Sequence, residues 1–405
     1  MTQHERAGDL EHLFADAVRD TMGSAVYGDW RSIQDADAVP LAFGFPYPEA
    51  LPNGELLSAA ESLVATEPER ALQYGGGESA ARLRDVVAER ARDRGIDCSS
   101  DAIHLTNGAT RAIDTVCRTF LEPGDEVVVE APTFMGALGI FRNHAARVTG
   151  VPVDEGGLDV EALADDLAAR AERGASQPKL VYTIPDFQNP TGVTMATDRR
   201  ERLLDLADAY DFVVLEDDPY GRLRYEGAER PPLKALDADS RVVRVNTFSK
   251  TIAPGVRTGW IVADETTAAQ FDRIDAGGEP SFTRGLIGRY CTDDRLDRAV
   301  SRLCEGYKRR RDRMLESLGE RMPPTVSWSE PRGGFFLWLE FPASVDAEAM
   351  LPDAIDAGVT YLPGSFFYPG DGGGRFARLS FSHASPAAID DGVEALARTV
   401  RDRTA

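Results

Sequence analysis

The chain has 405 residues, of which 42% are hydrophobic and 8% aromatic, and this is enough apolar material for a large buried core. Sixty-seven acidic residues outweigh forty-five basic ones, and the net charge of -22 argues against nucleic acid or an anionic membrane surface as a partner. The spacing of histidines and cysteines matches no metal site, and no signal-like N-terminus or long apolar run occurs, so we expect a cytoplasmic protein without a bound metal.

Short β-rich runs alternate along the chain with helix-length amphipathic stretches. Residues 1–55 are rich in proline and glycine around FGFPYPEALP, and we expect them to pack on a smaller domain. The runs AIHLTN, EVVVEAP, KLVYTIP, FVVLEDD, RVVRVNTF and RTGWIVA predict a mostly parallel sheet covered by helices within residues 56–300. After a long helical tract, VSWSEP, GGFFLWLEF, VTYLPG and FARLSFS alternate with two helices, which predicts a smaller α+β domain over residues 301–405.

Polar residues follow two of the predicted strands, at the sheet edge where α/β proteins place their functional groups. Gly108 follows the first strand and opens a helix, and the free amides of Ala109 and Thr110 could there bind a phosphate. A glycine-led helix that binds nothing is the alternative. Asn189 precedes a proline after the strand KLVYTIP, which holds it extended with its amide free to donate, although an ordinary turn would also explain the pair.

Two further positions carry groups with a specific chemistry. Asp217 ends a buried strand and needs a cation or a strong donor to stay ionised; a protonated pyridine nitrogen would serve, and a solvated acidic turn or a Mg²⁺ ligand pair is the alternative. Lys250 is one of four lysines beside forty-one arginines, and unlike arginine it can lose its proton and form a Schiff base. Around it, Thr247, Ser249 and Arg257 offer the hydroxyls and fixed charge that a phosphate monoester requires.

Taken in order, these sites resemble those of the class I/II aminotransferases that use pyridoxal 5'-phosphate. The resemblance covers nearly the whole chain and is closest to the branch of 2-aminoadipate, aromatic and branched-chain amino acid aminotransferases. The matching blocks are LQYGGGESAARLR, VEAPTF, FQNPTG, EDDPYGRL, FSKTIAPGVRTGW, PRGGFFLW and FARLSFS. It implies the fold-type-I architecture, an α/β large domain with a mostly parallel mixed sheet flanked by helices, plus a smaller α+β domain.

The resemblance also implies roles around the cofactor ring. Lys250 would hold the cofactor as an internal aldimine and then move the proton between substrate and cofactor. Asp217 would keep the ring nitrogen protonated, and Asn189 and Tyr220 would donate to the ring hydroxyl. Phe134 would stack on the ring face, at a position where the family often has tyrosine.

Phosphate and substrate contacts follow from the same resemblance. The implied phosphate site consists of Gly108, Ala109, Thr110, Thr247, Ser249 and Arg257. Arg257 stands seven residues after Lys250, where many relatives have eight. Arg378 would grip the substrate α-carboxylate bidentately, beside Asn189, and Gly44 would let the backbone approach that carboxylate, although Gly44 could equally be a plain turn glycine. Tyr74 would reach across a two-fold axis to the phosphate of a neighbouring subunit, which implies a homodimer with shared active sites.

The implied activity is transamination between an L-amino acid and a 2-oxo acid by a ping-pong mechanism. A β-lyase or decarboxylase on the same fold is the alternative within enzymes, because the protein decides which bond at the α-carbon breaks. A ligand-sensing regulatory domain is the alternative outside enzymes, but the acidic charge and the few residues before the first matching block oppose a DNA-binding partner domain. Aminoadipate, glutamate, aromatic and branched-chain donors all remain open.

Overall fold

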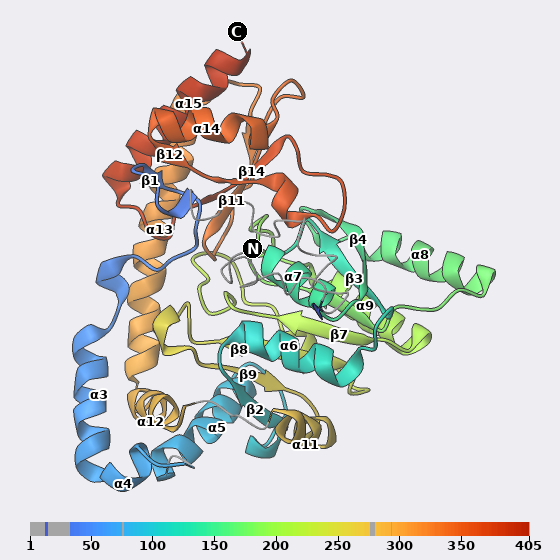
Figure 1. Ribbon diagram of the computed structural model, residues 1–405, viewed down its shortest axis with the longest axis vertical. Helices are drawn as coiled ribbons and strands as arrows, with labels where there is room; N and C mark the ends of the chain where they lie inside the picture. Colours follow the sequence, from blue (N-terminus) through green and yellow to red (C-terminus); the bar gives the residue numbers. More distant parts are fainter. Residues whose placement is uncertain (1–12, 15–32, 75–76, 276–279, 293, 405) are drawn as a thin grey trace, which may run out of the picture.

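The structure describes residues 13–14, 33–74, 77–275, 280–292 and 294–404 (Figure 1). Within these residues, an eight-stranded and a four-stranded β-sheet organise the fold, and a short two-stranded sheet adds to them. The structure is a computed structural model. Within these residues the larger sheet has eight strands in the order β2-β9-β8-β7-β6-β3-β4-β5. Its strands are β2 (Ile103–Thr106), β3 (Glu126–Ala131), β4 (Arg147–Asp154), β5 (Gly157–Leu158), β6 (Leu180–Thr183), β7 (Val213–Asp217), β8 (Val242–Thr247) and β9 (Gly259–Val262).

The larger sheet is mixed but mostly parallel, as predicted. β9 runs antiparallel to both β2 and β8, and β5 runs antiparallel to β4, whereas β4, β3, β6, β7 and β8 are parallel to their neighbours in that series. Only eleven residues without a long helix join β8 to β9, and a connection of that kind does not make the crossover that a parallel pair needs. The parallel strands place their carboxyl ends along one edge.

Helices cover both faces of this sheet because alternate residues of its strands are buried on opposite sides. Val127 and Val129 pack on one side with α6 (Ala109–Phe120), α7 (Met135–Asn143) and α11 (Glu265–Ile274). Val128 packs on the other side with α8 (Val160–Arg173), α9 (Thr197–Tyr210) and α10 (Leu233–Leu236). Sheet residues buried on both faces read as continuous apolar runs, which is why the sequence shows these strands clearly.

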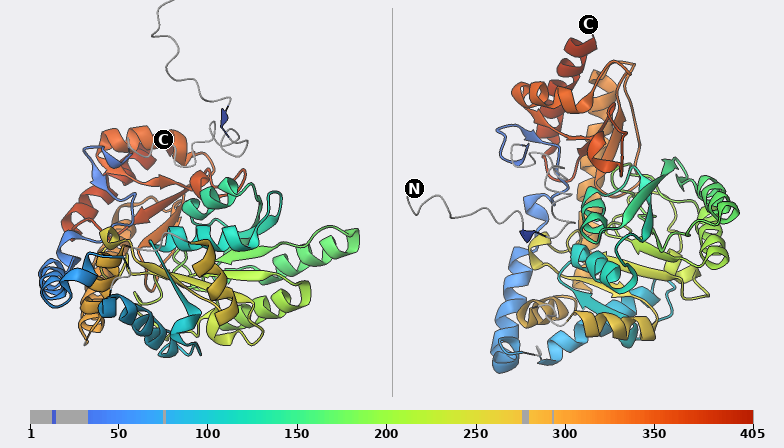
Figure 2. Two further views of the ribbon diagram at one scale, coloured as in Figure 1. Left: turned by 60° about the horizontal axis from the view of Figure 1, so that its bottom comes forward. Right: turned by 45° about the vertical axis from the view of Figure 1, so that its right-hand side comes forward.

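A second helical layer covers the β2 edge of the sheet. It contains α3 (Asn53–Thr66), α4 (Pro68–Ala71), α5 (Gly77–Arg92) and α12 (Ser281–Tyr290). From this layer the long helix α13 (Arg295–Arg321) runs along the side of the molecule to the second sheet (Figure 1, Figure 2).

The smaller sheet is antiparallel and lies at the far end of α13. Its order is β10-β11-β14-β13, from β10 (Ser327–Trp328), β11 (Phe336–Glu340), β13 (Leu362–Pro363) and β14 (Phe376–Ser380). It shares one core with α13, α14 (Ala347–Ala357) and α15 (Pro386–Thr404). The N-terminal segment joins this part, because β1 (Val39–Pro40) pairs with β12 (Val359–Thr360) and Leu41 is buried in the same core.

The observed architecture confirms the predicted α/β fold with a smaller α+β part. The expected boundary at residue 300 falls inside α13, and the division into residues 1–55, 56–300 and 301–405 stays a prediction. In the described ranges, no helix is long and apolar enough to span a bilayer. The same ranges contain no group of three or more histidine, cysteine, aspartate or glutamate side chains arranged to hold a metal ion.

Candidate active site

A cavity of about 240 Å³ lies at the carboxyl ends of the parallel strands, between the two sheets. Every predicted site residue except Gly108 and Tyr74 lines it, although these residues come from segments far apart in the sequence. The predicted lining residues are Gly44, Ala109, Thr110, Phe134, Asn189, Asp217, Tyr220, Thr247, Ser249, Lys250, Arg257 and Arg378. The remaining lining residues are Phe43, Phe45, Met135, Ile184, Pro219, Pro254 and Phe336.

Lys250 lies in the turn after β8, and its amine reaches into this cavity. Nζ donates a hydrogen bond of 3.0 Å to the carbonyl oxygen of Gly44 and lies 5.5 Å from the ring centre of Phe335. Burial first, and then the positive charges of Arg378 and Arg257, lower the pKa of the Lys250 amine to about 8. A sizeable fraction of this amine is therefore neutral near pH 8 and able to act as a nucleophile or a base.

Asp217 ends β7 and presents one oxygen that has no donor. Its side chain is 3% exposed, and Oδ2 accepts a hydrogen bond of 2.7 Å from the hydroxyl of Tyr182. Oδ1 is buried and has no hydrogen-bond partner among the described residues. Burial raises the pKa of the Asp217 carboxyl to about 7. An unpaired buried carboxylate oxygen beside a reactive lysine fits a protonated ring nitrogen such as that of pyridoxal 5'-phosphate.

Close packing between Gly108 and Arg257 shapes the other end of the cavity. Gly108 precedes α6 with a φ of 87°, and a Cβ added there would lie 2.4 Å from Nη2 of Arg257. Arg257 itself has a φ of 45°, a left-handed conformation that is uncommon for a residue with a side chain. The first amides of α6, those of Ala109 and Thr110, have no backbone acceptor in the described chain, as expected at a helix N-terminus. These groups together suit an anion.

Ser249 and Thr247 lie beside this anion-binding end. The Thr247 hydroxyl bonds within its own loop, to the carbonyl oxygen of Thr258 at 2.9 Å, and accepts from the amide of Ser249 at 3.1 Å. Its Oγ1 is also 2.9 Å from the hydroxyl oxygen of Ser249. Thr247 therefore holds the loop that presents Ser249, and the Ser249 hydroxyl is the better placed of the two to donate to a ligand.

Arg378 on β14 closes the cavity from the smaller sheet. Nη1 donates to Oδ1 of Asn189 at 2.8 Å, and Nη2 donates to the carbonyl oxygen of Ala42 at 2.7 Å. Its guanidinium carbon lies 3.9 Å from the ring centre of Phe336, and Nε has no acceptor among the described residues. Burial lowers the pKa of Arg378 to about 9. Because the Asn189 oxygen accepts from Arg378, the Asn189 amide nitrogen remains available as a donor toward the cavity.

Aromatic rings form the walls between these polar ends. Tyr220 is buried and packs against Phe335 and Phe336 at centroid distances of 5.4 and 5.8 Å. Phe134 stands at the start of α7, and its ring comes so close to Gly136 that a Cβ there would lie 2.4 Å away. Gly44 has the same relation to Phe336, with 2.5 Å to an added Cβ, so no larger residue fits at position 44 without a shift.

Tyr74 does not reach the cavity within its own chain. Its side chain is 98% exposed, and it is not among the lining residues. Such an exposed side chain can contact a second subunit, and within its own chain it does not contact the cavity.

Sequence reasoning missed several residues that the fold brings to the cavity. Phe43, Phe45 and Phe336 form apolar walls. Phe43 and Phe45 lie in a segment without a regular period, and Phe336 lies in a predicted strand whose position beside the cavity the sequence does not show. The Tyr182 hydroxyl and the carboxylate of Glu130, both buried in the large sheet, were also missed. The sequence offered one indication of Tyr182 and Glu130: each carries a polar group inside an apolar strand run, and such a group needs a buried hydrogen-bond partner.

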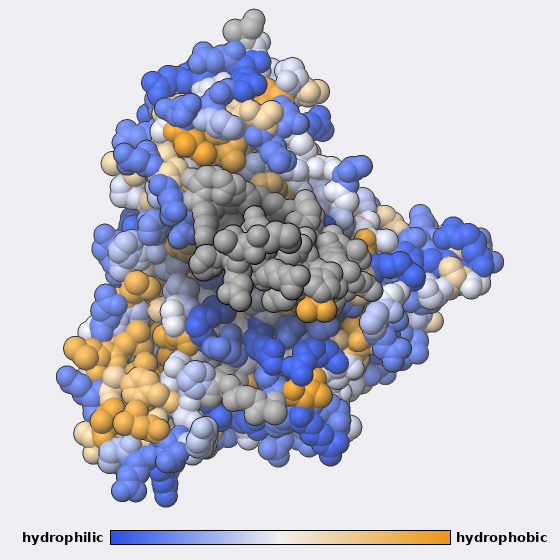
Figure 3. Space-filling view, viewed as in Figure 1, coloured by the Kyte–Doolittle hydropathy of each residue, from blue (hydrophilic) through white to orange (hydrophobic). Residues whose placement is uncertain are grey.

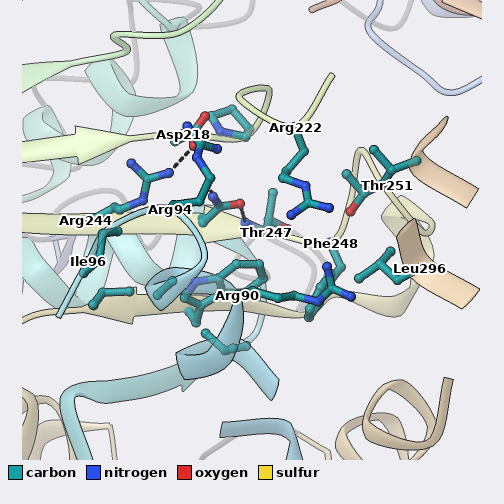
Figure 4. A pocket seen from close by; sticks show the side chains of 17 residues that line it. Arg90, Arg94, Ile96, Asp218, Arg222, Arg244, Thr247, Phe248, Thr251 and Leu296 are labelled. Atoms are coloured by element: carbon teal, nitrogen blue, oxygen red, sulfur yellow. Dashed lines mark hydrogen bonds and ion pairs between the residues drawn. The ribbon is translucent and has the colours of Figure 1, made fainter. Parts of the chain in front are cut away.

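A second, smaller cavity lies behind the Lys250 loop and shares Thr247 and Pro219 with the first (Figure 4). Its volume is about 60 Å³, too small for a cofactor of vitamin size. Arg244 enters it and is paired with Asp218, as the dashed line in Figure 4 marks, and also with Glu216 at 2.5 Å. We therefore assign no ligand to this cavity.

Comparison with known proteins identifies relatives along almost the whole chain. The family model for aminotransferase class I and II matches residues 46–396. The aromatic-amino-acid aminotransferase 1 of Thermococcus litoralis is 36% identical over 97% of this chain and 95% of its own length. The 2-aminoadipate transaminase of Thermus thermophilus is 32% identical over 89% of each chain. A crystal structure of Pyrococcus horikoshii kynurenine aminotransferase, 36% identical, superposes with a TM-score of 0.92 over 98% of both chains.

Proposed function

This chain belongs to the class I and II aminotransferases, and from that premise we propose that the cavity around Lys250 is its active site. It is a pyridoxal 5'-phosphate-dependent transaminase acting on amino acids and 2-oxo acids. The observation that carries the assignment of the site is the shared cavity. The Lys250 amine, the unpaired oxygen of Asp217, and Arg378 all face one space of about 240 Å³.

Lys250 is the proposed proton-transfer residue of the site. Bound pyridoxal 5'-phosphate supplies an aldehyde carbon that takes the amino nitrogen and a ring that accepts the electron pair left at the substrate α-carbon. Lys250 would hold the cofactor and, once its amine is free, would hold or return a proton at the substrate α-carbon. Its pKa of about 8 suits this work, because the amine can both accept and donate a proton near neutral pH.

The residues around the ring orient it and set its charge. Asp217 would accept a hydrogen bond from the ring nitrogen through Oδ1, which has no partner among the described residues, and would keep that nitrogen protonated. The Asn189 amide and the Tyr220 hydroxyl donate to the ring hydroxyl. Phe134 covers one ring face as an apolar plate, which excludes water from that side.

The anion-binding end holds the cofactor phosphate. The amides of Ala109 and Thr110 and the Ser249 hydroxyl donate to it, and Arg257 supplies the opposite charge. Gly108 is required because its missing side chain leaves the space that the Arg257 guanidinium occupies.

Arg378 receives the substrate α-carboxylate. Its planar guanidinium now donates to Asn189 and Ala42, and a bidentate carboxylate would take over part of this bonding. Gly44 lies close to the same place, since its carbonyl oxygen accepts from Lys250.

An aromatic or large apolar donor fits the described walls best. Phe43 and Phe45 stack on each other at a centroid distance of 5.6 Å, and Met135 and Ile184 add apolar surface. The cationic residues that line the cavity in the described ranges are Lys250, Arg257 and Arg378, and each already has a proposed role at the cofactor or the α-carboxylate. None of them is left to bind an acidic substrate side chain. The relatives named for aromatic amino acids and for kynurenine support the same donor class. Comparing kcat/KM for phenylalanine, 2-aminoadipate and glutamate tests it, and a preference for a dicarboxylic donor would contradict it.

A homodimer with shared sites explains why several large apolar residues of α3 and of the segment after α4 are exposed. Leu57 and Val64 on α3 and Leu72 after α4 are exposed together with Tyr74. Figure 3 shows apolar side chains gathered over α3 and toward α12. A large exposed apolar patch marks an interaction surface, and a second copy of the chain is the proposed occupant. Sedimentation or light scattering of the purified protein tests this, and a stable monomer would contradict it.

A single-turnover experiment separates transamination from the lyase and decarboxylase alternatives. Loaded enzyme is mixed with an amino donor and no 2-oxo acid. We expect one equivalent of 2-oxo acid and one of pyridoxamine 5'-phosphate per site, followed by arrest. Continued release of ammonia or of carbon dioxide would instead indicate elimination or decarboxylation. A ligand-sensing domain would give no turnover, but the match to aminotransferases along nearly their whole length does not favour it.

The expected cytoplasmic location stays a prediction.

A further inference from the structure

Tyr182 presents a buried hydroxyl to the proposed ring-nitrogen site. Its side chain is fully buried on β6, and the hydroxyl donates to Oδ2 of Asp217 at 2.7 Å. β6 and β7 are parallel neighbours in which Tyr182 pairs with Leu215. Because Asp217 follows Leu215 by two residues, it lies on the same face of the sheet as Tyr182.

No other side chain in the described ranges donates a hydrogen bond to the Asp217 carboxylate. Glu216 and Asp218 precede and follow it, so their side chains point to the opposite face, where both pair with Arg244. On the active-site face, Tyr182 therefore donates to Oδ2 of Asp217, and Oδ1 has no partner among the described residues. Fixing one oxygen of a carboxylate fixes the direction of the other.

Burial and the neighbouring negative charges oppose the ionised form of Asp217. Burial raises its pKa, the negative charges of Asp218 and Glu216 raise it further, and the hydrogen bond from Tyr182 and the charge of Arg244 oppose this rise. Glu130 on β3 adds a further buried carboxylate nearby, held by Thr183 and Gln188, and the Tyr220 hydroxyl lies on the cavity side. An ionised carboxylate is the form that accepts a hydrogen bond from a protonated nitrogen.

We propose that Tyr182 is a positioning residue that holds Asp217 ionised, with Oδ1 directed at the ring nitrogen of the bound cofactor. This inference rests on the role of Asp217 in the proposed function. A purely structural role is the competing explanation, since the Tyr182 ring also packs edge-on against Phe141 at a centroid distance of 5.5 Å. Tyr182→Phe separates the two, because it keeps the ring and removes only the hydroxyl.

The experiment measures binding to the apoenzyme of pyridoxal 5'-phosphate and of its 1-deaza analogue, in which carbon replaces the ring nitrogen. Wild-type enzyme should prefer the natural cofactor. In Tyr182→Phe we expect this preference to shrink by about tenfold, because affinity for the natural cofactor falls and affinity for the analogue does not. With each amino donor, kcat should fall while KM stays near the wild-type value.

Tyr361→Phe is the matched control. Tyr361 is also fully buried, and its hydroxyl donates to the carbonyl oxygen of Ala347 at 2.6 Å in the smaller part of the molecule. Its loss should lower the free energy of unfolding without changing the affinity for either cofactor form.

Two outcomes would overturn the proposal in different ways. If Tyr182→Phe loses affinity equally for both cofactor forms, Tyr182 acts through packing alone, and the role of Asp217 survives. If wild-type enzyme does not distinguish the two forms, the assignment of Asp217 fails, and the inference about Tyr182 fails with it.

A double variant gives a second test of the same proposal. Asp217→Asn removes the negative charge that the Tyr182 hydroxyl is proposed to stabilise. Adding Tyr182→Phe there should leave the preference between cofactor forms unchanged, and a further loss of preference would contradict the proposal.

Discussion

Replacing Gly108 with alanine tests the phosphate end of the proposed active site. Gly108 has a φ of 87° and a ψ of 165°, a combination that is essentially restricted to glycine and costs about 1–3 kcal/mol for any other residue. The added Cβ would also lie 2.4 Å from Nη2 and 2.8 Å from Cζ of Arg257. The guanidinium must therefore move away from the place where it would meet the phosphate.

Both effects are measurable in Gly108→Ala. The free energy of unfolding should fall by about 1–3 kcal/mol in denaturant titrations of the apoenzyme. Because a charge-assisted hydrogen bond contributes about 1.5–3 kcal/mol, affinity for pyridoxal 5'-phosphate should fall by roughly ten- to hundredfold in equilibrium dialysis. Saturating cofactor should restore kcat, since Lys250 is untouched.

Gly319→Ala is the control for the same chemical change at a helical position. Gly319 lies exposed in α13, and an added Cβ would have no atom within 4 Å. This variant should gain about 0.5–1 kcal/mol of stability and bind cofactor as wild type does. The reasoning is refuted if Gly108→Ala matches wild type in both stability and cofactor affinity.

Three further predictions address other parts of the site. Burial raises the pKa of Asp217 from 3.8 to about 7, so the folded apoenzyme binds the extra proton and loses stability as pH rises through this range, by at most about 4 kcal/mol. Apo Asp217→Asn should therefore gain stability over wild type between about pH 4 and 7 in denaturant titrations, and a constant difference would contradict this. Arg378→Lys should raise KM for every amino donor alike by about tenfold or more in steady-state kinetics, whereas a donor-selective rise would place Arg378 at the substrate side chain. Mixed dimers of Tyr74→Ala and Lys250→Ala should recover activity, because one of their two sites then has both native residues; activity equal to the average of the parents would show that Tyr74 acts within its own chain.

The central residues of the site could be predicted because their chemistry restricts the residue type. A Schiff base needs a lysine, and a bidentate carboxylate site favours arginine, so Lys250 and Arg378 could be assigned from their sequence blocks. Asp217 could be singled out because it ends a buried apolar strand, and its proposed role at the ring nitrogen came from the family resemblance. The structure brings all three to one cavity.

Contacts made by irregular segments could not be predicted. The Lys250 amine bonds to the carbonyl of Gly44, and the Arg378 guanidinium bonds to that of Ala42, although more than two hundred residues separate the partners in each pair. Backbone carbonyls carry no residue-specific signal, and the segment around them has no helical or strand period. The Tyr182 bond to Asp217 was missed for another reason, because it depends on the register between β6 and β7.

Reduction of the cofactor-loaded enzyme with borohydride, followed by peptide mapping, tests the central claim most directly. The chain offers only four lysines, which are Lys179, Lys234, Lys250 and Lys308, so each can be assigned by mass. We expect the reduced cofactor on Lys250 in wild-type enzyme and no covalent label in Lys250→Ala, which should still bind the cofactor noncovalently. A label on any other lysine, or a label that persists in Lys250→Ala, would contradict the assignment of this cavity as the active site.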